Sequence, residues 1–216
     1  TEIYTLSLHN ALPILASLTP SYALTNDGVL NIASGWLLPS TIDGVENKYI
    51  NNNIMTLGSA GENVELLHTQ LINNGLVQGA TGDNKLENNN STITNNADGT
   101  INMDIANSPF AALGITDEDL EAYMDNTLDP VNDADKISLL DNYLAVTEES
   151  TLDSVSEGLR ASNFGTLVNY GTITGNIGNK YGEVQNLLAI DDDNNLVATG
   201  TITGDIDNRD GELYNE

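Results

Sequence analysis

The chain has 216 residues, of which 32 are acidic and 6 are basic, so its formal net charge is −26 at pH 7. A field of this sign repels phosphate backbones and anionic lipid surfaces, which argues against nucleic-acid binding and binding to acidic membranes. Cysteine is absent, so the chain has no thiol site. Histidine occurs twice, and the spacing of serine, histidine and aspartate residues does not indicate a Ser-His-Asp triad. The sequence contains no run of about 18 apolar residues, which is the length that a membrane-spanning helix needs.

The first 23 residues are set apart from the fold. Thr1–Ile14 resembles, at 13 of 14 positions, the conceptual translation of a common short-read sequencing adapter, and only Asn10 departs from it. We therefore interpret residues 1–14 as a sequencing artefact and exclude them from fold reasoning. Residues 15–23 are mostly apolar and end in Ser-Tyr-Ala, which predicts the remnant of a secretory signal peptide. The alternative is a strand that caps the fold.

Residues 24–112 repeat a turn motif in which Asn or Asp precedes Gly and an apolar residue follows. The intervals between these glycines are irregular, so we expect β-solenoid coils from which loops of different lengths leave. Because Asn-Gly pairs also form hairpin turns, an antiparallel sandwich is the alternative. Asn84–Asn90 is read as a loop. The motif is found at Asn26-Asp27-Gly28, Asp43-Gly44, Asn74-Gly75 and Asp98-Gly99.

Residues 113–161 switch to helical spacing, which predicts two or three short amphipathic helices inserted into the strand pattern. Thr116 and Asp119 form a near capping box for the first helix, Asn132 or Asp133 is expected to cap the second, and Thr147 the third. Such an insertion is either a binding element, or a spacer or a cap that covers the core. The apolar positions are Leu120, Tyr123, Met124 and Leu128, then Ile137, Leu140 and Leu144, then Leu152, Val155 and Leu159.

Residues 162–216 contain two nearly identical stretches, Leu167–Asn186 and Leu196–Asn215, which match at 12 of 20 positions with an offset of 29 residues. Self-similarity at this period is typical of stacked-repeat architectures. Within each stretch Thr alternates with Ile, which is the period of a strand. The repeat predicts that Ile173 lies over Ile202 in successive turns of one winding chain.

Asparagine is abundant, with 30 residues. In a 29-residue coil, Asn179 would lie above Asn208 at the inter-strand spacing of about 4.8 Å. Stacked asparagine side chains hydrogen-bond along such ladders in cross-β structures. We therefore expect asparagine ladders at the turns.

Candidate chemistry is sparse. His68 is expected on an outer strand face or in a turn, without a catalytic role. Asp191–Asp193 offers oxygen ligands of the kind that Ca²⁺ prefers, but a solvated acidic turn is the preferred interpretation. Asp129–Asp133 lacks the glycine and the terminal glutamate of an EF-hand loop. No catalytic, cofactor-binding or metal-binding residue is assigned.

Basic residues are scattered along the sequence, which argues against a lyase site in which a cation steadies a substrate carboxylate. Clustering of Lys48 and Lys85 with acids in one groove would favour such an enzyme. The six basic residues are Lys48, Lys85, Lys136, Arg160, Lys180 and Arg209.

The repeat region Gly165–Asn215 resembles the Asn-x-Gly-Thr-Ile-x-Gly repeats in passenger regions of bacterial autotransporter adhesins and related β-helical surface proteins. NYGTITGNIGNKYGEVQN at Asn169–Asn186 carries the resemblance, and TGTITGDIDNRDGELYN at Thr199–Asn215 follows it. It implies an all-β fold, a right-handed parallel β-helix, exported to the cell surface for adhesion or display. The helical insertion is unusual for such stalks.

The sequence therefore predicts a fragment, truncated at both ends, of a secreted or surface-anchored acidic β-solenoid. It would be a monomeric stalk within a longer chain that binds host or matrix glycans or proteins, without catalysis or cofactor. The alternatives are a β-helical polysaccharide lyase or hydrolase, and a segment of a phage fibre.

Overall fold

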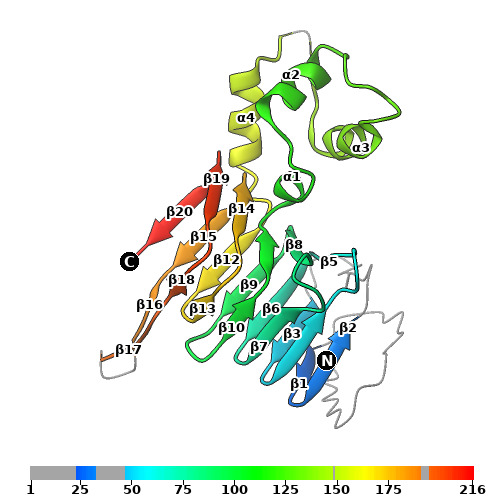
Figure 1. Ribbon diagram of the computed structural model, residues 1–216. Helices are drawn as coiled ribbons and strands as arrows, with labels where there is room; N and C mark the ends of the chain where they lie inside the picture. Colours follow the sequence, from blue (N-terminus) through cyan, green and yellow to red (C-terminus); the bar gives the residue numbers. More distant parts are fainter. Residues whose placement is uncertain (1–22, 33–46, 148, 191–194) are drawn as a thin grey trace.

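The computed structural model describes residues 23–32, 47–147, 149–190 and 195–216. These residues form a mostly β protein with three parallel sheets, a short antiparallel hairpin and four helices (Figure 1). The stretch 1–14 interpreted above as a sequencing artefact and most of the expected signal remnant lie outside the described residues, as do the Asp43-Gly44 motif and the acidic residues Asp191–Asp193.

Short strands stack side by side to build each parallel sheet. The seven-stranded sheet contains β1 (Ala23–Asn26), β3 (Asn47–Asn51), β6 (Thr69–Asn73), β9 (Thr92–Asn95), β12 (Thr166–Asn169), β15 (Glu183–Asn186) and β20 (Glu212–Asn215). The six-stranded sheet contains β2 (Val29–Ile32), β4 (Ile54–Leu57), β7 (Leu76–Gly79), β10 (Thr100–Asn102), β13 (Thr172–Ile173) and β18 (Thr201–Ile202). The five-stranded sheet contains β5 (Val64–Leu67), β8 (Lys85–Asn89), β11 (Asp104–Ala106), β14 (Ile177–Lys180) and β19 (Ile206–Arg209).

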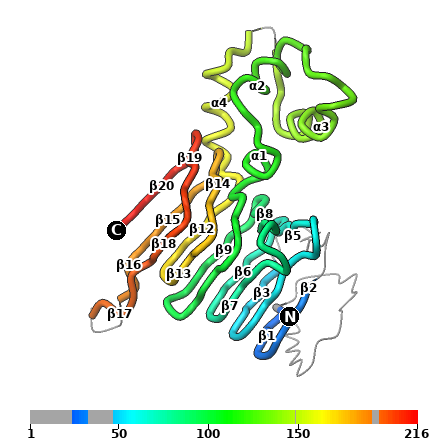
Figure 2. Tube along the Cα trace, in the orientation of Figure 1, coloured from blue at the N-terminus to red at the C-terminus, as the bar shows by residue number. Residues whose placement is uncertain are grey.

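The chain passes through the three sheets in a fixed order, and each passage is called a circuit here. One circuit runs through β12, β13 and β14, and the next begins at β15, which pairs with β12. The winding of the backbone is visible in Figure 2. All pairings within the three sheets are parallel, and Ile173 on β13 pairs with Ile202 on β18. The stacking predicted from the repeat is therefore confirmed, and the antiparallel sandwich is wrong for the described strands.

Side chains alternate between the two faces of each strand, so every second side chain points into the core. Leu71, Ile93, Leu167 and Val184 occupy one register position of the seven-stranded sheet, and each is at most 1 % exposed. Each circuit covers the apolar side chains of the circuit before it, because strands this short bury little surface alone.

Asparagine side chains form a continuous ladder where the seven-stranded sheet turns into the six-stranded sheet. Each Nδ2 donates to the Oδ1 of the asparagine one circuit on, over 2.7 to 2.8 Å. Asn26, Asn73 and Asn169 are each followed two positions later by a glycine. At Gly75 the backbones approach so closely that a Cβ would lie 2.2 Å from the Asn53 carbonyl oxygen. The ladder consists of Asn26, Asn51, Asn73, Asn95, Asn169, Asn186 and Asn215.

A second ladder joins Asn88, Asn107, Asn179 and Asn208 at the turn that follows the five-stranded sheet. The predicted stacking of Asn179 over Asn208 is confirmed, with 2.6 Å between Nδ2 and Oδ1. This ladder begins at Asn88, whose Oδ1 has no donor. The reason is that Leu66 occupies the paired position on β5.

The 29-residue offset is the length of the last circuit and not of the others, so the 29-residue coil expected above holds for one circuit only. Successive members of the first ladder are 22 residues apart at Asn51, Asn73 and Asn95, and 17 apart from Asn169 to Asn186. The 29 residues between Asn186 and Asn215 include the antiparallel hairpin of β16 (Leu188–Ile190) and β17 (Leu196–Thr199). The first letters of the second repeat thus form β17, which pairs with β16 and does not stack on β12.

Four helices leave the stack after β11 and return to it at β12. They are α1 (Pro109–Ala112), α2 (Asp117–Met124), α3 (Ala134–Tyr143) and α4 (Leu152–Arg160). Three of them fall where the apolar spacing predicts helices, and α1 is an addition. No helix within the described residues is long and apolar enough to span a bilayer.

The helix caps agree with the sequence in part. Thr116 and Asp119 form the predicted capping box of α2. Asp133 occupies the N-cap position of α3 but makes no capping bond, since its carboxylate accepts from the Asp129 amide. Thr147 does not cap α4, because it closes a turn with Ser150, and the capping residue is Thr151.

The helices have a core of their own, which includes Phe110 of α1, Leu120 of α2, Leu140 of α3 and Leu159 of α4. Tyr181, from the turn after β14, enters the same core. Helix α1 contacts β8, β11 and β14. The helical core is therefore continuous with the strand stack at this turn.

The stretch Asn84–Asn90 is not a loop, which corrects the sequence expectation. Most of it is the strand β8, paired in parallel with β5 and β11. Its asparagines face the ladder or the neighbouring circuit rather than solvent: Asn88 is fully buried and Asn89 is 7 % exposed.

Substitution of Asn73 by Ala should be strongly destabilising. The Asn73 side chain is fully buried and makes five hydrogen bonds, so its loss leaves neighbouring amides and carbonyls unpaired. We expect a loss of about 2–4 kcal/mol in the free energy of unfolding, measured by urea titration. The control is Asn74→Ala, because Asn74 belongs to a more exposed row with Asn52 and Asn96. An equal loss of unfolding free energy in both variants would show that the buried ladder contributes no more to stability than the exposed row.

Deletion of residues 188–199 should leave the fold intact. The Gly200 amide already donates to the Leu187 carbonyl over 2.9 Å, so the two ends of the hairpin insertion lie together. The deletion would create Asn186-Leu187-Gly200, the same pattern as Asn169-Tyr170-Gly171 one circuit earlier. We expect an unchanged strand signal in circular dichroism and a melting temperature within about 5 °C of the parent. Loss of cooperative unfolding would contradict this account of the offset.

Candidate functional site

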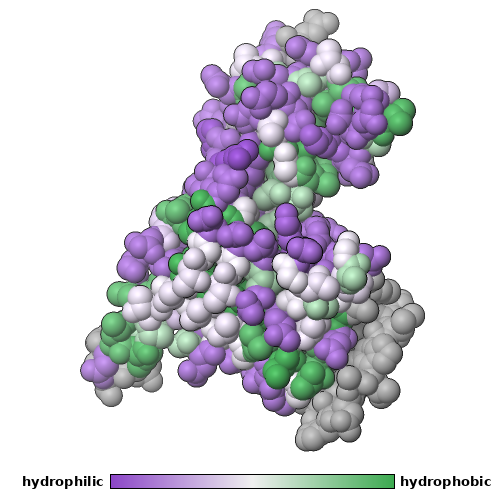
Figure 3. Space-filling view, viewed as in Figure 1, coloured by the Kyte–Doolittle hydropathy of each residue, from purple (hydrophilic) through white to green (hydrophobic). Residues whose placement is uncertain are grey.

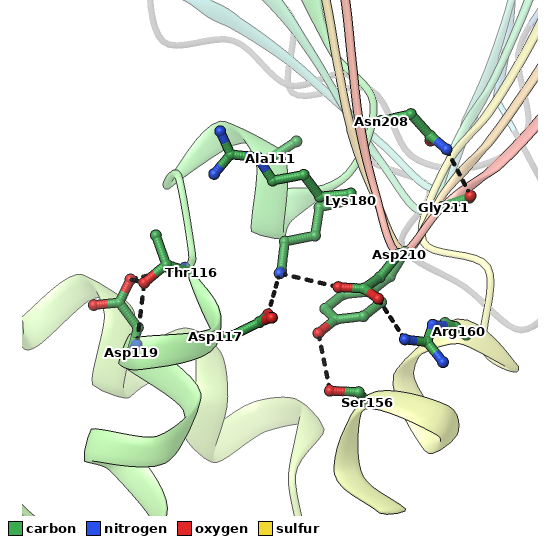
Figure 4. Close-up of polar contacts among 12 residues, drawn as sticks. Ala111, Thr116, Asp117, Asp119, Ser156, Arg160, Lys180, Asn208, Asp210 and Gly211 are labelled. Atoms are coloured by element: carbon green, nitrogen blue, oxygen red, sulfur yellow. Dashed lines mark hydrogen bonds and ion pairs between the residues drawn. The ribbon is translucent and has the colours of Figure 1, made fainter. Parts of the chain in front are cut away.

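Charged side chains gather where the helices meet the strands, at the ends of β14 and β19 (Figure 4). We call this set the junction cluster, and its members are Asp117, Arg160, Lys180, Arg209 and Asp210. It contains three of the six basic residues of the chain. Hydrophilic residues dominate the surface over the helices, whereas a paler band lies over the strands (Figure 3).

Lys180 lies at the centre of the junction cluster. It is the last residue of β14 and only 4 % exposed. Its Nζ lies 3.0 Å from Oδ1 of Asp117 and 3.5 Å from Oδ2 of Asp210. Burial by itself lowers the pKa of Lys180, but the hydrogen bond to Asp117 and the surrounding negative charge outweigh it and raise the pKa above its usual value. The ammonium group therefore stays charged and paired.

Asp210 joins helix α4 to the strands. It lies in the turn between β19 and β20 at a φ of 55° and accepts a hydrogen bond from Arg160, the last residue of α4. Burial alone would raise the pKa of Asp210, but the Arg160 hydrogen bond and the Lys180 charge lower it below its usual value. The same hydrogen bond raises the pKa of Arg160.

Tyr181 packs against the junction cluster and connects it to the helices. Its backbone has a φ of 59°, and its ring is 1 % exposed. The Lys180 ammonium lies 4.9 Å from the centre of this ring, within the range of cation–π attraction. The ring also meets Phe110 of α1 edge-on at 5.3 Å, and its hydroxyl lies 3.5 Å from Ser156 Oγ of α4. The turn is thus fixed to two helices.

A small open cavity of about 200 Å³ lies at the junction. Lys180 and Arg209 give it two positive charges, and carboxylates give it three negative ones. The Arg209 guanidinium is already paired with Asp207 at 2.9 Å. The lining residues are Thr116, Asp117, Glu118, Lys180, Arg209 and Asp210.

Chemically, the junction cluster is suited to holding elements together. Its central cation is shared between two carboxylates, and each of these belongs to a different segment. Within the described ranges, no group of three or more His, Cys, Asp or Glu residues is placed to hold a metal ion. The cluster therefore positions α2 and α4 on the ends of β14 and β19.

Several basic residues that are far apart in the sequence lie close together in the folded chain. Arg160, Lys180 and Arg209 come together, and Lys136 of α3 pairs with Asp119 of α2 at 2.6 Å. Lys48 and Lys85, by contrast, lie on different sheets, on β3 and β8. Sequence spacing missed the junction cluster because its members are separated by up to 93 positions, from Asp117 to Asp210.

His68 and Asp129 both lie in turns. His68 is exposed in the turn between β5 and β6, with a φ of 49°, as expected for a turn residue. The Asp129 carboxylate accepts from the backbone amides of Val131 and Asn132 and from the Asn132 side chain. These hydrogen bonds lower the pKa of Asp129, and they form the turn that leads into α3.

Comparison with models of known protein families, with curated proteins and with solved structures found no match to this chain.

Substitution of Asp210 by Asn should weaken the attachment of the helices. We expect a loss of about 1–2 kcal/mol in the free energy of unfolding at pH 7, because two charged hydrogen-bond donors lose their anionic partner. The control is Asp207→Asn, which removes the same charge from an exposed pair and should cost less than about 0.5 kcal/mol.

The effect of Asp210→Asn should also depend on pH. Because the folded-state pKa of Asp210 is lowered, its contribution is present above the unfolded value of about 3.9 and is lost as pH falls through the folded value. The difference between parent and variant in urea titrations should therefore be constant near neutral pH and shrink below about pH 4. A difference that grows on acidification would contradict the ion-pair assignment.

Proposed function

We propose that this chain is a right-handed parallel β-helix of the kind found in bacterial surface adhesins, and that it acts as a binding scaffold without catalysis. The observation that carries the proposal is the stacking of circuits in parallel register, held by two asparagine ladders. A crossover between parallel strands is right-handed in nearly all known sheets, which supports the handedness.

Stacked circuits suit adhesion because they give long outer faces whose side chains keep a constant spacing. Rows of polar side chains on these faces can hydrogen-bond sugars or proteins without any one residue being essential. The fold also tolerates insertions: the β16–β17 hairpin and the four helices both leave the stack and return to it. Such projecting elements are frequent carriers of binding specificity.

The basic residues support a binding role over polysaccharide cleavage. A lyase needs a cation available to a substrate carboxylate, but Lys180, Arg160 and Arg209 are each paired with an aspartate of the chain. Lys48 and Lys85 lie on separate sheets and so do not provide the shared groove that an enzyme would need.

The acidic composition supports a location outside the cytoplasm, on the cell surface or in secreted form. A net charge of −26 keeps a strand-rich protein soluble and apart from other copies of itself. Its expected partners are host or matrix glycans or proteins.

The proposal predicts saturable binding of the full chain to immobilised glycans or matrix proteins. Biolayer interferometry at 0.15 M NaCl against neutral glycans, acidic glycans and matrix proteins is the direct measurement, and the unfolded chain in urea is the control. Release of new reducing ends or unsaturated sugars from any of these polysaccharides would contradict the proposal and favour the enzyme. Absence of binding to every partner class would also contradict it.

A further inference from the structure

Among the described residues, the outer face of the six-stranded sheet carries no charged side chain on its strands. Strand alternation places two outward columns on it, at the first and third positions of each strand segment, and all of their members are exposed or partly exposed. The first column is Val29, Ile54, Leu76, Thr100, Thr172 and Thr201. The second column is Asn31, Thr56, Gln78, Asn102, Thr174 and Thr203.

The other two sheets place charges at equivalent outward positions. The seven-stranded sheet has Lys48, Glu183 and Glu212 in one outward column. The five-stranded sheet has Glu65 and Glu87 side by side, and burial raises the pKa of Glu87. Charged residues make up 18 % of the chain and favour surfaces. The two columns of the six-stranded sheet together hold twelve positions without a charge, whereas each of the other two sheets has charges in at least one outward column.

The two columns have different chemistry. Every member of the first column carries a methyl group, and Thr100, Thr172 and Thr201 add a hydroxyl at one end of the row. Every member of the second column is an uncharged hydrogen-bonding side chain. The face thus combines an apolar stripe with a polar stripe.

The spacing of these groups is fixed by the backbone. Neighbouring strands lie about 4.8 Å apart, and the two columns are about 6.8 Å apart along each strand. Within the second column, Thr174 Oγ1 donates to Asn102 Oδ1 over 2.7 Å, and Gln78 Nε2 donates to Thr56 Oγ1 over 3.2 Å. These bonds orient the polar side chains before any ligand binds, which lowers the entropy cost of binding.

We propose that this face binds an uncharged polysaccharide whose chain runs along the stack of strands. The inference rests on the proposed binding function and names its ligand class and its site. Sugar rings offer apolar C–H faces to the methyl column and hydroxyl groups to the amide and hydroxyl column.

Charge selects the neutral polymer over other partners. An anionic polysaccharide is repelled by the net charge of −26. A basic protein would be drawn to the carboxylates of the other sheets and of the helices. A neutral chain is neither repelled nor drawn away, and on this face no charge loses its hydration when the ligand binds.

The test uses the full chain and two matched substitutions. Thr172→Glu introduces a charge into the first column between Thr100 and Thr201. Thr92→Glu makes the same change on the outer face of the seven-stranded sheet, between Gln70 and Thr166. Both threonines are half-buried, each precedes an inward isoleucine, and both have uncharged neighbours, so the two variants should be equally folded.

The probes are dextran, mannan, laminarin and hydroxyethylcellulose as neutral polymers, and alginate and polygalacturonate as anionic ones, in affinity gel electrophoresis. We expect the parent to be retarded by at least one neutral polymer and by neither anionic one. Thr172→Glu should weaken that binding about tenfold or more, which is about 1.4 kcal/mol, and Thr92→Glu should change it less than twofold. Replacing the hydroxyl by a methyl group in Thr174→Val should weaken it by a smaller factor.

The outcomes separate the inference from the proposed function. Equal weakening by Thr172→Glu and Thr92→Glu would overturn the site while leaving a glycan-binding scaffold in place. Binding only to anionic polymers or only to matrix proteins would overturn the ligand class. Binding to no partner at all would overturn both.

Discussion

The stacking of each circuit on the one before it, in parallel register, is the constraint on which the rest of this structure depends. Two columns of asparagine enforce it, because successive amides hydrogen-bond to one another, and several of them, such as Asn73 and Asn179, also close their own turn through the backbone. These amides are buried, and a buried polar group is costly unless it is paired. A shift of one residue in one circuit would break the ladder there and turn the apolar row outward.

This constraint acts only at the corners and inward positions, so what lies between them is free to vary. The spacing along the first ladder is 22 residues in the regular circuits, 17 in the shortest, 29 where the hairpin is inserted and 74 where the helices are. The helical insertion needs further contacts to hold it against the strands. Their own apolar core, the ring of Tyr181 and the ion pairs of Lys180 and Asp210 fix them to the strand ends.

The distribution of charge links the fold to the proposed function. Most basic residues are used in contacts among the helices or at their junction with the strands. Among the described residues, the acidic side chains lie on the helices, the turns and two of the three sheets, while the outer face of the six-stranded sheet has none. A polymer that carries no charge would meet no electrostatic barrier on that face.

The sequence by itself determined the strand character, the stacking of Ile173 on Ile202 and of Asn179 on Asn208, and the positions of three helices, because these follow from local periodicity and from repeated letters. It did not determine the length of a circuit, because a short circuit and a hairpin together produce the same offset as one long coil. It also did not reveal the junction cluster or the uncharged face. Both join residues from several circuits, and only the register of the folded chain decides which side chains become neighbours.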